Sequence, residues 1–148
     1  MACHADYVLW HMHMRSARVQ VQPLSLERVS GLSPANACTV SHSPIDPSLL
    51  AYAAGAHAVI YDSAMRQQTR ALASGGGRTL LCVAFSPDGA CLVAGEKGQA
   101  PAVLVWEVSS GRMVHEMRGH KHGVARLSFS YDGELGACKG SKTARAGT

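Results

Sequence analysis

The sequence predicts an all-β fold built from repeated four-stranded units, and three observations support that prediction. Residues 80–89 read LLCVAFSPDG and residues 124–133 read VARLSFSYDG, so equivalent positions recur 44 residues apart. Short apolar runs with β-branched and aromatic members alternate with turn residues such as Ser, Pro, Asp and Gly. No stretch of useful length shows the 3.6-residue apolar spacing of an amphipathic helix.

The clearest repeat predicts four consecutive strands. The first is the apolar run 80–85, which is closed by the turn Ser86-Pro-Asp-Gly89, where Pro presets φ and Gly accepts a positive φ. The other three strands are expected at 91–94, 102–108 and 112–117. The fourth strand is the most polar, so we expect it to be the exposed outer edge of the unit.

A looser copy precedes this repeat, and the start of another follows it. The strands of the earlier copy are expected at 38–43, 49–54, 58–62 and 69–73, with a turn at 44–46. Three glycines at 75–77 link it to the next unit. Residues 124–129 are the opening strand of the following copy, and Asp132-Gly133 repeats the turn.

This period is typical of one class of fold. Repeats of about 40 to 45 residues with Gly-His and Trp-Asp-like dipeptides are typical of β-propeller blades. A closed propeller has roughly four to eight blades, and even four of this length exceed the 148 residues present. We therefore expect a propeller fragment of about two and a half four-stranded blades. Uncovered apolar blade faces at its two ends predict self-association.

Residues that recur at the same position of each repeat are explained more simply by a structural role than by a catalytic one. Asp88 and Asp132 sit in the same turn of successive copies, so turn formation explains them better than catalysis. Trp106 is expected in the core because it lies in the third strand of its blade. The residues to which we assign a structural motif role are Phe85, Asp88, Gly89, Trp106, Gly119, His120, Phe129, Asp132 and Gly133.

These motifs resemble those of a known family. Phe85-Ser-Pro-Asp-Gly89, Val105-Trp106-Glu107 and Gly119-His120 look like WD repeats. The segments 26–29, 51–55, 59–62, 95–98, 101–103 and 119–125 look like the N-terminal repeats of the mitogen-activated protein kinase-binding protein 1 family, which includes a spindle-pole scaffold. Looser similarity extends to microtubule-associated and flagellar WD-repeat families. The resemblance implies a large cytoplasmic scaffold whose partners are kinase-cascade components or microtubule and spindle proteins.

The sequence departs from the WD pattern at two motif positions and at both ends of the chain. A full repeat carries a hydrogen-bonded His, Ser or Thr, Asp and Trp, but here the His position falls on Gly76 and the Ser position on Ala94. Residues 134–148 carry no strand pattern, so we read them as an irregular basic tail, foreign to the fold and possibly a gene-model artefact. Residues 1–22 match nothing in the family and are expected to be a disordered arm. The propeller fragment is assigned to 23–133.

No catalytic, cofactor-binding or metal-binding constellation is expected. His4, His11 and His13 crowd the N-terminus, but they have no fixed ligand geometry. Five cysteines without short spacing, and no secretory signal, are most simply reduced thiols of a cytoplasmic protein. The net charge of +4 is scattered, which argues against nucleic acid. No apolar run is long enough to cross a membrane.

Binding is expected on loops at one end of the blades. Loops on a rigid scaffold usually carry binding, and the exposed candidates are Glu96, Lys97, Gln99, Lys121 and His122. We therefore predict a non-enzymatic scaffold for other proteins, of the kinase-binding and spindle type. A structural microtubule- or axoneme-associated protein is the alternative.

Overall fold

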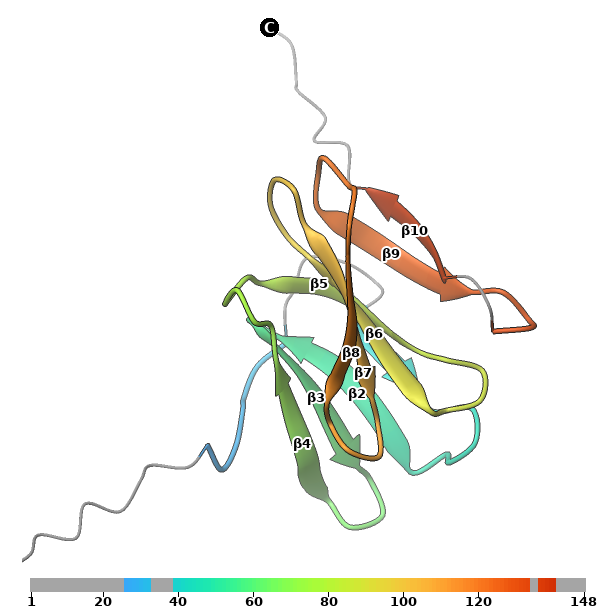
Figure 1. Cartoon of the computed structure of the whole chain (residues 1–148). Helices are drawn as coiled ribbons and strands as arrows, with labels where there is room; N and C mark the ends of the chain where they lie inside the picture. Colours follow the sequence, from blue (N-terminus) through green and yellow to red (C-terminus); the bar gives the residue numbers. More distant parts are fainter. Residues whose placement is uncertain (1–25, 33–38, 134–135, 141–148) are drawn as a thin grey trace, which may run out of the picture.

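The structure, a computed structural model, describes residues 26–32, 39–133 and 136–140, and these residues form strands but no helix. The strands are β1 (Val40–His42), β2 (Leu49–Ala54), β3 (His57–Asp62), β4 (Gln67–Ala73), β5 (Leu80–Phe85), β6 (Cys91–Glu96), β7 (Ala102–Glu107), β8 (Met113–Arg118), β9 (Val124–Phe129) and β10 (Gly136–Gly140). They form two antiparallel four-stranded sheets, β1-β2-β3-β4 and β5-β6-β7-β8, and one two-stranded sheet, β10-β9 (Figure 1). The predicted all-β, blade-like fold is confirmed.

The repeated turn has the same geometry in two copies. The Ser86 hydroxyl donates to the Asp88 carboxylate, and the Gly89 N–H donates to the Ser86 carbonyl at 2.8 Å. In the next copy the Gly133 N–H donates to the Ser130 carbonyl at 3.0 Å. Gly89 and Gly133 have φ of 67° and 74°, a left-handed conformation that favours glycine. The predicted turns therefore exist, and they have a physical reason to contain Gly.

The two complete blades share one hydrophobic core. Cross-strand pairing in the second blade places Phe85, Leu92 and Trp106 in one row, and Val83, Ala94 and Leu104 in the next. All six are buried in one cluster with residues of the first blade. We call this side of a blade its front face. In the second blade most residues of β6 and β7 are buried, on both sides of the sheet, which explains their nearly continuous apolar sequences.

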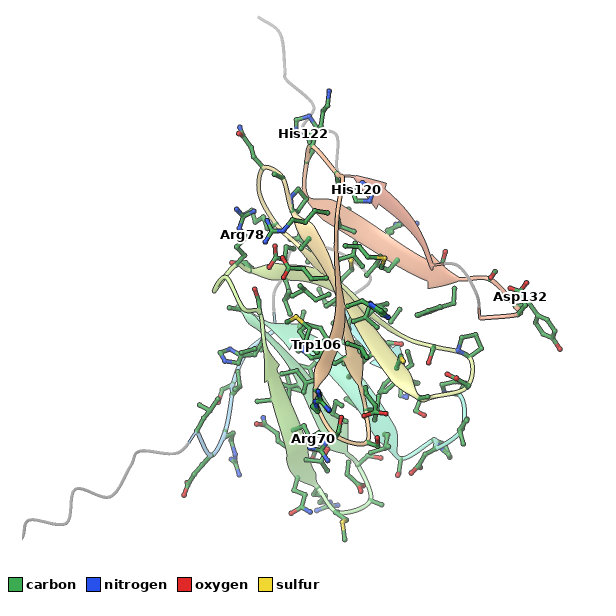
Figure 2. The ribbon with its side chains drawn as sticks, in the orientation of Figure 1. Arg70, Arg78, Trp106, His120, His122 and Asp132 are labelled. Atoms are coloured by element: carbon green, nitrogen blue, oxygen red, sulfur yellow. The ribbon has the colours of Figure 1, made fainter. Side chains whose placement is uncertain are left out.

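Polar ties reinforce this contact. The Phe85 N–H donates to the Ser41 hydroxyl at 3.1 Å, which joins the first strands of the two blades. Arg70 on β4 donates to the carbonyl oxygens of Ser109 and Ser110 in the β7–β8 turn. Arg70 and Trp106 are labelled in Figure 2. The ties cross between blades, so they orient one sheet on the other.

β9 is seated directly on the second blade. The Cys82 thiol donates to the Val124 carbonyl at 3.2 Å. A Cβ on Gly95 would lie 2.7 Å from Val124 Cβ and 2.9 Å from Cys82 Sγ, which is closer than real Cβ atoms come. Glycine at position 95 therefore permits the close approach of β9 to β6. We call this second side of a blade its rear face.

The fourth strand is the outer edge, as predicted for a blade. Every residue of β8 is exposed, whereas most residues of β5, β6 and β7 are buried. Within the described residues, β8 pairs only with β7. No helix in this part of the chain is long and apolar enough to span a membrane.

The prediction that residues 134–148 carry no strand was wrong for one segment. Gly136–Gly140 forms β10, which pairs antiparallel with β9. Its Gly-Ala-Cys-Lys-Gly sequence lacks β-branched residues, and the partner strand supplies backbone hydrogen bonds that do not depend on side chains. The first 22 residues, assigned as an arm, and residues 141–148 lie outside the described part of the structure.

Candidate protein-binding surface

Three connections meet at one end of the blades. They are the link between the blades around Arg78, the β6–β7 connection and the segment that leads into β9. A Cβ on Gly123 would lie 3.4 Å from the Gly98 backbone nitrogen, so the second and third connections touch. Arg78 Nη1 donates to the carbonyl oxygens of Gln99 at 2.8 Å and Ala100 at 3.3 Å, which joins the first to the second.

We name the exposed side chains of these connections the loop face: Arg78, Lys97, Gln99, Lys121 and His122. Figure 2 shows Arg78, His120 and His122 at the same end of the molecule, away from Asp132. Three of the five members carry a permanent positive charge. The chain therefore holds a basic surface on connections that the blades position, which suits an acidic partner surface.

Glu96 was predicted to be an exposed contact residue, and this is wrong. Its side chain is 3% exposed, because β6 continues through Glu96 instead of ending at Ala94. One carboxylate oxygen accepts from the Ser74 hydroxyl at 2.8 Å, and the other accepts from the Ala102 N–H at 3.0 Å. A buried carboxylate requires such partners. Glu96 therefore joins the link between the blades to the β6–β7 connection, beneath the loop face.

Ser74 was not among the predicted site residues, because a serine next to three glycines has no sequence pattern that indicates a buried role. It ends the first blade, is buried, and supplies the hydroxyl that Glu96 accepts. The two expected departures from the WD pattern lie close by: Ala94 is fully buried and Gly76 is exposed. The hydrogen bonds of Glu96 with Ser74 and Ala102 are thus the buried polar contacts that the second blade has near these two positions.

The residues assigned a motif role are spread through the fold. Phe85 and Trp106 lie in the shared core, at 7% and 2% exposure. Phe129, the last residue of β9, and His120, which precedes that strand, are half-buried, and Gly119 has a φ of 154°. The remaining members, Asp88, Gly89, Asp132 and Gly133, belong to the two repeated turns. Their motif roles stay predictions, and no catalytic arrangement brings them together.

A cleft of about 730 Å³ lies on the rear face of the second blade, beside β9. Its apolar lining comes from Val93, Val103, Val105, Met117, Leu127 and Phe129. His120 precedes β9 and Asp132 follows it, so they mark the two ends of the cleft, roughly 20 Å apart for a strand of this length. The apolar lining is typical of a surface that another strand or peptide covers.

Two groups at the rim have shifted pKa values. Hydrogen bonds from the Ser86 hydroxyl and the Ala90 N–H lower the pKa of Asp88, which favours its charged form in the turn. Burial raises the pKa of the Cys91 thiol, and the Asp88 and Glu107 carboxylates act in the same direction. A thiol kept protonated is a poor nucleophile, so Cys91 does not suggest catalysis.

Within the described residues, no group of three or more His, Cys, Asp or Glu side chains is placed to hold a metal ion. The N-terminal histidines 4, 11 and 13 lie outside these residues. The loop face and the cleft therefore remain the two surfaces with a candidate function.

Repeated four-stranded antiparallel blades with a shared core, a buried third-strand Trp and the repeated turn define a WD-repeat β-propeller fold. The chain is 39% identical over 102 residues to WD repeat-containing protein 62 of Sus scrofa, and 38% identical over 102 residues to mitogen-activated protein kinase-binding protein 1 of Mus musculus. Both alignments cover 69% of this chain. The resemblance to this group of WD-repeat proteins is therefore confirmed.

A more distant relative is centriole proteome protein 16 of Chlamydomonas reinhardtii, which is 32% identical over 108 residues and covers 51% of this chain. No protein-family model matches the chain. The chain spans only 6% and 7% of the length of the first two relatives.

Proposed function

We propose that the chain is a non-enzymatic protein-interaction module whose loop face binds an acidic surface of a mitogen-activated protein kinase. The observation that carries this proposal is the convergence of three connections into one exposed basic surface above a rigid, shared core. The name of the murine relative supplies the class of partner.

The fold supports this role through rigidity. Each connection is held at both ends by strands, and the buried Glu96 carboxylate fixes the β6–β7 connection from below. Side chains on a pre-formed surface lose less conformational entropy on binding than side chains on a free loop. A charged surface of this kind also raises the association rate at low ionic strength.

A binding titration tests the proposal. The full chain and a purified mitogen-activated protein kinase are mixed in a calorimeter, and the measurement is repeated with Lys97→Glu/Lys121→Glu. We expect at least a tenfold weaker Kd for the double variant, because two attractive contacts become repulsive. The matched control is Arg66→Glu/Arg112→Glu. It changes the charge equally at the β3–β4 and β7–β8 turns, which lie at the opposite end of the antiparallel sheets.

Equal weakening by both double variants would show that only net charge matters, and absence of binding by the unaltered chain would exclude the kinase. The second candidate function is association with microtubules, in the cytoplasm or at the spindle. The likeness to a centriole proteome protein favours it, and its test is co-sedimentation of the chain with polymerised tubulin.

A further inference from the structure

The link between the blades holds the base of the β6–β7 connection. The Lys97 N–H donates to the Thr79 carbonyl at 2.8 Å, and the Arg78 N–H donates to the Ser74 hydroxyl at 3.3 Å. The same hydroxyl donates to the buried Glu96 carboxylate. The base of the connection is therefore fixed to the link by backbone groups and by buried side chains.

The outer part of the connection, residues 98–100, is held by one exposed side chain of the same link, and we call these three residues the tip. Arg78 Nη1 donates to the carbonyl oxygens of Gln99 and Ala100, and a Cβ on Gly98 would lie 3.9 Å from the same nitrogen. Within the described residues, the hydrogen bonds of Gln99 and Ala100 are those with Arg78. The guanidinium thus lies against the whole tip.

The backbone of the tip has a conformation that needs such support. Gly98 and Ala100 have φ of 115° and 47°. For alanine, which has a Cβ, a left-handed φ is unfavourable and persists only where surrounding contacts hold it. The hydrogen bond from Arg78 to the Ala100 carbonyl is such a contact. Removal of the guanidinium should therefore release the tip.

The segment that leads into β9 rests on the connection beside the tip. A Cβ on Gly123 would lie 3.4 Å from the Gly98 nitrogen and 3.5 Å from the Lys97 Cα. Lys121 precedes Gly123 by two residues, so the separation of the Lys97 and Lys121 ammonium groups depends on where the tip lies. Two of the three permanent charges of the loop face are therefore arranged through the third, Arg78.

We propose that Arg78 is the positioning residue of the loop face, and this role rests on the kinase binding proposed above. It holds the tip in one conformation, so that Lys97, Gln99 and Lys121 contact the acidic partner together. Because Nη1 is used within the chain, Arg78 acts through the geometry of its neighbours more than through its own charge. A pre-formed tip loses less conformational entropy on binding, whereas attraction between exposed charges weakens as salt is added.

Nuclear magnetic resonance relaxation of the free full chain tests the positioning role without a partner. The order parameters of the amides at 98–100 should be about 0.85, the value of a rigid backbone, and Arg78→Gln should lower them below about 0.6. Arg112→Gln is the matched control, because it removes the same charge from an exposed arginine between β7 and β8, at the opposite end of the sheets. A mobile tip in the unaltered chain, or a rigid tip in the Arg78→Gln chain, would overturn the proposal.

Titration of the kinase at two ionic strengths separates geometry from charge. The Arg78→Gln chain should bind roughly tenfold more weakly than the unaltered chain at both ionic strengths, whereas the Arg112→Gln chain should stay within about twofold. Between about 0.1 M and about 0.5 M salt the screening length falls from about 10 Å to roughly 4 Å, so a loss caused only by a missing charge would shrink. A loss confined to low salt would therefore contradict the positioning role.

Gly98→Ala perturbs the tip and leaves every charge in place. A Cβ at a φ of 115° is strained, so the tip changes its conformation, and we expect weaker binding at both salt concentrations. Unchanged affinity of this variant would also contradict the positioning role.

Urea denaturation of each variant measures whether the blades still fold. The midpoints should stay close to that of the unaltered chain, because Arg78 and Gly98 are exposed. A large fall for Arg78→Gln would show that Arg78 stabilises the blades themselves and would overturn the proposal. Absence of kinase binding by the unaltered chain would instead overturn the proposed function, and the relaxation experiment would still decide whether Arg78 holds the tip.

Discussion

Trp106 is the largest fully buried side chain among the described residues, and it lies where the two complete blades meet. Trp106→Ala should lower the free energy of unfolding by about 3–5 kcal/mol, because the substitution removes buried apolar surface and leaves a cavity. Urea denaturation followed by circular dichroism measures the change. An unaltered midpoint would show that the blades do not share a core at this residue.

The buried Glu96 carboxylate should be energetically coupled to Ser74. Glu96→Ala removes the acceptor from the Ser74 hydroxyl and the Ala102 N–H, while Ser74→Ala removes one donor to Glu96 and the acceptor of the Arg78 N–H. Hydrogen bonds to charged groups contribute about 1.5–3 kcal/mol. A double-mutant cycle in the same denaturant should therefore give a coupling of about 1–3 kcal/mol. Strictly additive effects would mean that the two side chains do not interact in solution.

At the level of single residues, the sequence predicted the burial of apolar residues correctly but was misleading about the exposure of one charged residue. The burial of Trp106 follows from its position in an apolar third strand. Glu96, in contrast, stands beside glycine and lysine at a strand end, which is the pattern of a solvated loop. A buried carboxylate is stable at this position because its oxygen accepts a hydrogen bond from Ser74, which lies 22 residues away in the chain.

At the level of the elements, the packing of β9 against β6 depends on a glycine at position 95, because glycine has no Cβ. Gly95→Ala should destabilise the fold by roughly 1–3 kcal/mol, because its Cβ would overlap Val124. Amide exchange should speed up in β9 before it does in β2 or β3. Val124→Gly added to Gly95→Ala should recover part of the loss, because it removes both the Cβ and the Cγ1 atoms that the new methyl group would overlap. No rescue, or uniform acceleration in every strand, would count against this contact.

The strand order follows from the sequence because turn residues separate apolar runs of regular length. The limits of β6 and the existence of β10 do not follow from the sequence in this way. A strand that pairs through its backbone on a neighbouring edge needs little side-chain pattern, and β10 has little.

At the scale of the whole molecule, the 44-residue repeat predicts the class of fold, because a repeat unit that buries its faces on neighbours must stack. The loop face is only partly predictable. Lys97, Gln99, Lys121 and His122 were recognisable as exposed polar residues, whereas Arg78 joined them through its contacts with Gln99 and Ala100. Adjacency of connections from different blades is a property of the stack and has no local sequence signal.

Amide hydrogen exchange on the full chain, free and saturated with the proposed kinase partner, tests most directly whether the blades present the loop face to another protein. Binding there predicts slower exchange at 76–79, 97–100 and 119–123, with little change at the turns 86–90 and 109–112 at the opposite end of the sheets. Slower exchange confined to those opposite turns, or no change anywhere at saturation, would contradict the assignment of the loop face as the binding surface.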